Sequence, residues 1–171
     1  NGRYLPSELT KLYTQNDKRV GDIISSLEKY LRDINEVRAL CFCVTQEHAE
    51  YMAEKFTLAG FKADYLISSR NNEREELRKK FLKKEINYLF VVDIFSEGID
   101  IPDIDTVLFL RPTESLTIFL QQLGRGLPLA EGKDCLTVLD FVGNSRPEYD
   151  FEGKFRALIG KTNTSIQKEK E

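Results

Sequence analysis

The sequence lacks the features that mark several common classes of protein. Nothing in its 171 residues reads GxxxxGK[ST], the loop that cradles nucleotide phosphates, and no GxGxxG follows a predicted strand. No apolar run approaches the roughly 20 residues that span a bilayer, and nothing at the start reads as a signal peptide. The formal net charge of -3 excludes a polybasic nucleic-acid binder, so any nucleic-acid contact has to be local.

Thiol and metal chemistry also have little support. The three cysteines, Cys41, Cys43 and Cys135, form no CxxC pair, and His48 is the only histidine. Cys41 and Cys43 lie two apart in an apolar segment, so they share one face of a predicted strand. We interpret them as small core residues of a cytoplasmic protein, because thiols stay reduced in the cytosol.

Five apolar segments alternate with helical patterns along the chain. The expected strands cover residues 39–44, 62–67, 86–93, 106–110 and 136–141. The expected helices cover residues 20–34, 45–60, 72–84, 114–125 and 150–158. Apolar strands separated by helices predict an α/β domain with a parallel sheet and helices on both faces, a three-layer α/β/α arrangement.

A chain of this length forms one domain that buries about two-thirds of its surface on folding. We expect residues 1–16 to be a leading segment or linker, 17–160 the domain, and 161–171 a charged tail that starts the next segment. The chain does not begin with methionine, and we expect both ends to lie within a longer protein. In a parallel α/β sheet, ligands meet the carboxyl ends of the strands, where Thr45, Ser68, Asp93 and Arg111 are expected.

The segment that ends on Arg125 has a helical pattern with two different faces. Its apolar stripe would face the sheet and consists of Leu116, Phe119, Leu120 and Leu123. Arg125 falls nearly opposite that stripe, with Gln121 one turn earlier on the same outward side. Gly124 and Gly126 flank the arginine and allow a ligand or another backbone to approach closely. An arginine in such a place can neutralise phosphoryl oxygens during phosphoryl transfer.

An acidic turn precedes this helix in the sequence. Its carboxylates are Asp93, Asp100, Asp103 and Asp105. Clustered carboxylates can bind hard cations, but Pro102 stiffens the segment and the spacing fits no EF-hand loop, so we predict no metal site. We interpret Asp100 as an acceptor for a ribose hydroxyl, with Gly98 leaving room for the nucleotide.

Two further segments have both a structural and a functional interpretation. Thr45 either caps a helix or opens a helix end whose free backbone N–H groups hold a nucleic-acid phosphate, and the two roles are compatible. The basic run over residues 78–84 either contacts phosphates or forms a solvated helix face. We favour the solvated face, because Glu75 and Glu76 lie one turn before Lys79 and Lys80.

These motifs resemble those of superfamily 2 helicases. The strand, acidic turn, strand, helix and GRG sequence is similar to motifs V and VI, and FCVTQEHAE is similar to motif IV. Residues 37–160 therefore look like the second RecA-like domain of a DEAD/DEAH-type helicase. The strings EGIDIP and RPTESLT are similar to those of a bacterial group that often carries a phospholipase D-like nuclease domain.

The resemblance implies a motor in which this domain and an N-terminal RecA-like domain clamp ATP with Mg²⁺ and move along DNA or RNA. When the resemblance is carried over to this sequence, it implies that Arg125 is an arginine finger. It also implies that Gly98, Asp100 and Gln121 contact the nucleotide. The nucleic-acid contacts that it implies fall at Thr45, Gln46 and Val92, with Ser68 at a neighbouring strand end. ATP would be bound mainly by the N-terminal domain, so we expect this chain alone to hydrolyse none.

Pro128 departs from the helicase pattern. The family motif GRxxR has a second arginine where this chain has proline, which carries no charge and biases Leu127 away from helix. The alternative to an active motor is therefore a degenerate nucleic-acid-binding scaffold that no longer hydrolyses ATP.

Overall fold

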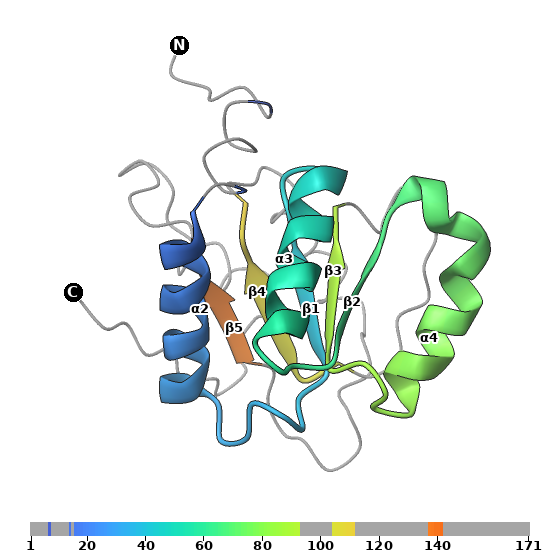
Figure 1. The fold of residues 1–171 in the computed structure, drawn as a ribbon. Helices are drawn as coiled ribbons and strands as arrows, with labels where there is room; N and C mark the ends of the chain where they lie inside the picture. The colour runs from blue at the N-terminus through green and yellow to red at the C-terminus, as the bar shows by residue number, and fades with distance from the viewer. Residues whose placement is uncertain (1–6, 8–13, 15, 93–103, 112–136, 142–171) are drawn as a thin grey trace, which may run out of the picture.

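The computed structural model describes Ser7, Thr14 and residues 16–92, 104–111 and 137–141. Five strands form one sheet: β1 Ala39–Phe42, β2 Ala63–Leu66, β3 Tyr88–Val91, β4 Thr106–Phe109 and β5 Thr137–Asp140. Their order is β2-β3-β1-β4-β5, and every pairing is parallel (Figure 1). Because Ala39 pairs with both Tyr88 and Thr106, the three central strands start level and end level. All five carboxyl ends consequently lie along one edge of the sheet.

The described helices are α2 Asp17–Tyr30, α3 Gln46–Leu58, the 3₁₀ helix η1 Ser68–Glu73 and α4 Arg74–Leu82. Asn16 caps α2, since its side-chain oxygen accepts a hydrogen bond from the Arg19 N–H at 3.0 Å. In Figure 1, α2 and α3 cover the same face of the sheet, while α4 lies beside the edge strand β2. Gly60 follows α3 with a φ of +93°, a left-handed conformation in which glycine carries no steric cost.

Apolar side chains of α2 and α3 meet one face of the sheet in the main core. Phe56 on α3 is fully buried, with ring centroids 5.1 Å from Tyr88 and 5.0 Å from Phe90 on β3. Cys41 and Cys43 are free and fully buried in the same cluster, which confirms that they share a face. Burial raises the pKa of both thiols, because it penalises the thiolate.

The opposite face of the sheet is buried as well. Phe42 on β1 stacks on Phe109 on β4, with their ring centroids 5.4 Å apart. The other buried side chains on this face of the central strands are Leu40, Leu89, Val91 and Val107. Burial on both faces confirms the predicted parallel sheet and explains why its strands are apolar at consecutive positions. No helix in the described part of the chain is long and apolar enough to cross a membrane.

The predicted elements that fall within the described residues agree with the structure at their centres and differ at their ends. The helix expected over residues 20–34 ends at Tyr30, because Leu31 adopts an extended conformation with a ψ of 136°. The Asp33 carboxylate then accepts a hydrogen bond from the Asn35 N–H at 3.0 Å and stabilises a turn. Leu31 and Ile34 still pack into the core, so the apolar spacing was real although the helix is shorter.

The helix expected over residues 72–84 also differs from the structure. Its α-helical part, α4, covers only Arg74–Leu82, and residues 72 and 73 belong to the preceding 3₁₀ helix η1. The expected helices over 114–125 and 150–158 lie outside the described residues, as do 161–171 and most of 1–16. The domain bounds therefore stay predictions.

Asp105, grouped with the acidic turn in the sequence, is a structural residue. It is buried, and one carboxylate oxygen accepts hydrogen bonds from the Arg38 N–H at 3.0 Å and the Thr106 hydroxyl at 2.9 Å. The Asp105 N–H donates to the Arg38 carbonyl at 3.1 Å. These bonds join the segments that lead into β1 and β4, so Asp105 aligns the starts of two central strands.

We predict that Asp105→Ala lowers the free energy of unfolding by about 2 kcal/mol, because it leaves the buried Thr106 hydroxyl and the partly buried Arg38 N–H without their shared acceptor. Urea denaturation followed by circular dichroism measures this change. Asp22→Ala, on the exposed side of α2, is the matched control and should stay within about 0.5 kcal/mol of the unsubstituted chain. Equal effects of the two substitutions would contradict the role assigned to Asp105.

Candidate functional site

The candidate site lies at the edge of the sheet where the five strands end. Thr45 and Gln46 follow β1, Ser68 follows β2, and Val92 follows β3. The level strand ends place all four predicted nucleic-acid contacts on this one edge. The predicted nucleotide and catalytic residues Gly98, Asp100, Gln121 and Arg125 lie outside the described residues, so their roles stay predictions.

Thr45 is the N-cap of α3. Its backbone is extended, with a φ of −141°, and its hydroxyl oxygen accepts a hydrogen bond from the His48 N–H at 3.2 Å. The Thr45 carbonyl accepts from the Ala49 N–H at 3.0 Å, which completes the first turn. The structure thus confirms the capping role of Thr45, while phosphate binding at the same helix end remains a prediction.

Gln46 and Ser68 are brought together although they lie 22 residues apart in the sequence. The Gln46 side-chain amide donates a hydrogen bond to the Ser68 hydroxyl oxygen. Because β3 lies between β1 and β2, this bond passes over the end of β3, which Val92 follows. The Ser68 side chain is exposed, and its hydroxyl still has a proton to donate to a ligand oxygen.

Val92 and Arg111 form a second connection along this edge. Nη1 of Arg111, which follows β4, donates a hydrogen bond to the Val92 carbonyl at 2.9 Å. Since β1 lies between β3 and β4, the Arg111 side chain spans the end of β1. Its charge acts on the Cys43 thiol, where it partly opposes the rise in pKa caused by burial. The sequence placed Arg111 at a strand end but gave no sign of this bond.

His48 and Arg19 hold α3 and α2 against the same edge. Nδ1 of His48 accepts a hydrogen bond from the Val44 N–H at 3.1 Å, which ties the first turn of α3 to the end of β1. Nη2 of Arg19 donates to the Phe141 carbonyl after β5, also at 3.1 Å. Burial, aided by the nearby charge of Arg19, lowers the pKa of His48 to about 4, so the imidazole is neutral at pH 7. Sequence reasoning missed both residues, because each acts on a distant or backbone partner.

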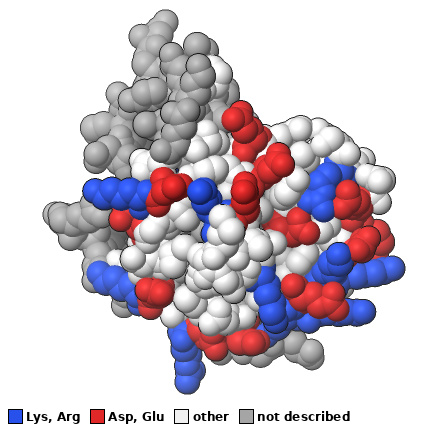
Figure 2. All heavy atoms as spheres, viewed as in Figure 1, with Lys and Arg blue, Asp and Glu red and all other residues white. Residues whose placement is uncertain are grey.

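The basic run on α4 is paired with acidic side chains. Nζ of Lys80 lies 2.8 Å from Oε1 of Glu76, and Nη1 of Arg78 lies 3.5 Å from Oε1 of Glu75. Figure 2 shows positive and negative side chains intermixed over this side of the molecule. This arrangement supports the interpretation as a solvated helix face. Among the described residues, no group of three or more His, Cys, Asp or Glu side chains is placed to hold a metal ion.

The parallel five-stranded sheet, with its helices and its polar carboxyl edge, defines a RecA-like α/β domain. The chain belongs to the helicase conserved C-terminal domain family, whose model matches residues 22–127. This match confirms the resemblance to superfamily 2 helicases at the level of the domain.

The chain is also similar to individual helicases. It is 35% identical to IRC3 of Saccharomyces cerevisiae, named as an ATP-dependent helicase, over 76% of this chain and 19% of that protein. It is 36% identical to irc3 of Schizosaccharomyces pombe, named as a mitochondrial ATP-dependent helicase, over 84% of this chain and 23% of that protein. The chain thus spans less than a quarter of either relative.

A solved structure agrees with the fold. The DEAD-box protein SrmB of Escherichia coli superposes with a TM-score of 0.54 at 21% identity, over 71% of this chain and 68% of that one. At this identity the likeness shows a shared RecA-like fold.

We predict that the free energy of unfolding decreases as the pH is lowered, and that His48 causes part of this decrease. The unfolded chain gains a proton near the ordinary pKa of 6.5, while the folded chain does so only near 4. Between these values the unfolded state binds more protons, so the free energy of unfolding falls as the pH falls, by up to about 3 kcal/mol for this group.

His48→Asn tests this, because its amide oxygen can accept the Val44 bond but does not titrate in this range. Urea denaturation at a series of pH values should give a shallower slope for the variant than for the unsubstituted chain. Equal slopes would show that His48 does not titrate in the way proposed.

Proposed function

We propose that this chain is the C-terminal motor domain of an ATP-dependent helicase or translocase that acts on DNA or RNA. The observation that carries the proposal is the family match over residues 22–127, a range that contains Gly98, Asp100, Gln121 and Arg125. In the proposal this chain supplies one wall of an ATP site. An N-terminal RecA-like domain of the same protein supplies the other wall and most of the contacts to ATP and Mg²⁺.

The described edge of the sheet fits such a wall. The Arg111–Val92 bond ties the ends of β3 and β4 together across β1. The segment that carries Asp100 follows Val92, and the segment that carries Arg125 follows Arg111. The bond therefore fixes the distance between the starting points of the two segments. Gly98 and Asp100 would contact the nucleotide, and Gln121 and Arg125 would contact its phosphates. ATP bound with Mg²⁺ supplies the phosphoryl group, and Arg125 would neutralise the charge that develops on its oxygens.

The nucleic-acid contacts in the proposal are Thr45, Gln46, Ser68 and Val92. The end of α3 next to Thr45 offers backbone N–H groups, and the Ser68 hydroxyl can donate to a phosphate oxygen. Val92 has no side-chain donor for a phosphate oxygen, so its contact would be the weakest of the four.

Three finer points belong to the same proposal. A cytoplasmic location is supported by the free, buried thiols of Cys41 and Cys43. A bacterial source and an association with a phospholipase D-like nuclease domain are supported only by the strings EGIDIP and RPTESLT.

A second candidate function is a scaffold that binds nucleic acid without hydrolysing ATP. Pro128 favours it, because a proline cannot replace the second arginine of the family pattern. The two candidates differ in the turnover of the whole protein and not in its fold.

We predict that the 171-residue chain binds single-stranded nucleic acid weakly and in a salt-dependent way, through local phosphate contacts. Fluorescence anisotropy with a labelled oligodeoxythymidine and a labelled oligouridine measures both affinities. Ser68→Ala should weaken binding by about three- to tenfold, the usual contribution of one hydrogen bond. Ser25→Ala, on the exposed side of α2, should have no effect. Absence of binding at low salt, or binding that ignores salt, would contradict the proposal.

We predict that this chain alone hydrolyses no ATP, and that the whole protein binds ATP but hydrolyses it slowly. In the whole protein, Pro128→Arg should raise the steady-state turnover at least about tenfold, equivalent to about 1.4 kcal/mol of barrier. Arg125→Ala should abolish the remaining turnover. A Pro128→Arg protein whose steady-state turnover is unchanged with nucleic acid saturating would show that Pro128 does not replace a missing finger.

A further inference from the structure

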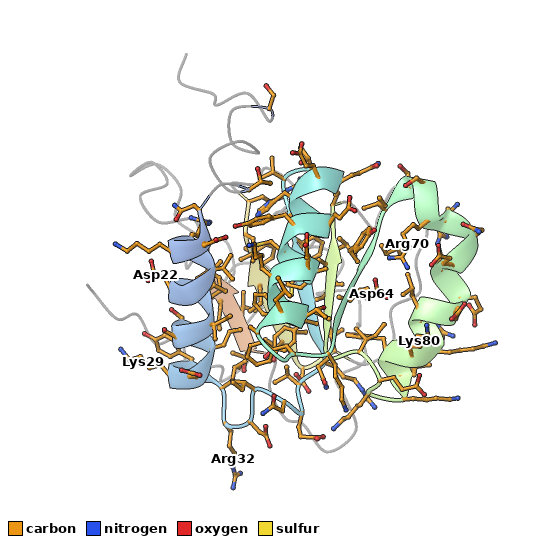
Figure 3. The ribbon with its side chains drawn as sticks, in the orientation of Figure 1. Asp22, Lys29, Arg32, Asp64, Arg70 and Lys80 are labelled. Carbon is orange, nitrogen blue, oxygen red and sulfur yellow. The ribbon has the colours of Figure 1, made fainter. Side chains whose placement is uncertain are left out.

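Arg70 joins the edge strand β2 to the 3₁₀ helix that follows it. Its Nη1 donates to the Asp64 carboxylate and to the Tyr65 carbonyl, both at 2.8 Å. Its Nη2 and Nε donate to the Glu73 carboxylate at 2.6 and 3.2 Å. The guanidinium carbon also lies 4.5 Å from the centroid of the Tyr65 ring. Figure 3 labels Arg70 and Asp64 between β2 and α4.

Within the described part of the chain, the 3₁₀ helix η1 has few other contacts that stabilise its conformation. It buries no residue, and no side chain caps its start at Ile67. Short 3₁₀ helices have poorer hydrogen-bond geometry than α-helices, so one that buries nothing depends on side-chain contacts for its conformation. The backbone at Arg70 departs from helical geometry, with a φ of −106° and a ψ of 22°. That kink lies at the residue whose side chain makes the four bonds.

Ser68 is the first residue of η1 and lies two residues before Arg70. The bond from Gln46 reaches Ser68 across the end of β3, so it depends on where η1 places the Ser68 hydroxyl. We propose that Arg70 is a positioning residue that holds η1 so that Ser68 and Gln46 contact nucleic acid as a pair. This inference rests on the proposed nucleic-acid function.

Arg70 is poorly suited to bind a phosphate itself. Two carboxylates already share its guanidinium, so the group of Arg70, Asp64 and Glu73 carries a net charge of −1 (one positive and two negative side chains). The hydrogen bond from Arg70 holds the pKa of Glu73 below its ordinary value, and this bond in turn raises the pKa of Arg70, so both stay charged. The role of Arg70 is therefore to order the loop.

Glu73→Gln separates positioning from simple electrostatics. The substitution removes a negative charge, so electrostatics alone would strengthen binding of a labelled oligodeoxythymidine. Positioning requires the opposite, because a neutral amide oxygen holds the Arg70 guanidinium less strongly than the carboxylate does. We therefore expect binding about three- to tenfold weaker. Glu76→Gln is the matched control: it removes the same charge from the Lys80 pair on α4 and should bind equally or more tightly. Tighter binding by Glu73→Gln would overturn the inference.

Arg70→Met tests whether Arg70 acts through Ser68. If it does, the double variant with Ser68→Ala should bind no more weakly than the weaker of the two single variants. The dependence of affinity on salt should also keep its slope, whereas a direct phosphate contact would reduce it by about 0.7 for single strands. Arg32→Met, at the opposite end of the strands (Figure 3), is the control. Additive effects or a reduced slope would overturn the inference.

A binding-independent measurement completes the test. In the NMR spectrum of the unsubstituted chain, the Gln46 side-chain amide should have shifts typical of a hydrogen-bonded group. Arg70→Met and Glu73→Gln should move these shifts toward those of a free amide, and Arg32→Met should not. Unmoved shifts would overturn the inference. Absence of nucleic-acid binding by the unsubstituted chain would overturn the proposed function and this role together, whereas binding that both variants leave unchanged would overturn only the role of Arg70.

Discussion

The pairing of β1 with β3 on one side and β4 on the other is the constraint on which the rest of the structure depends. Because all three strands are parallel and level, the segments that follow them leave the sheet at one edge. Hydrogen bonding in the sheet and burial of both faces reinforce this pairing, and a slip of one residue would turn every core side chain to the opposite face. Asp105 adds to it from the other end, where its carboxylate joins the starts of β1 and β4.

Side chains that reach across a strand turn this edge into a connected surface. Gln46 meets Ser68 over the end of β3, and Arg111 meets Val92 over the end of β1. Each of these two bonds joins the ends of two strands that are separated by a third strand. They couple elements that the backbone hydrogen bonds of the sheet do not join directly.

Many basic side chains of this domain form ion pairs with nearby carboxylates. The basic residues of α4 are paired with glutamates, and Arg70 is shared by two carboxylates. With a net charge of -3, the chain has no bulk attraction for a polyanion. Recognition would therefore depend on where a few donors are held, which gives loop geometry more weight than the number of lysines and arginines.

The sequence by itself determined the alternation of strands and helices, the burial of Cys41 and Cys43, and the helix start at Thr45. These follow from short-range rules, because apolar periodicity and capping depend on residues a few positions apart. It also carried the motifs that match the helicase family. The end of α2 at Tyr30 was not predicted, since Leu31 and Ile34 continue the apolar spacing beyond the helix.

Only the tertiary structure decided the order of the strands and the contacts at their ends. The sequence grouped Asp105 with the acidic turn, but folding buries it against Arg38, which lies 67 residues away. His48, Arg70 and Arg111 look like ordinary polar residues in the sequence. Their partners are carbonyls, backbone N–H groups and carboxylates that become neighbours only when the sheet forms, so no local pattern could identify them.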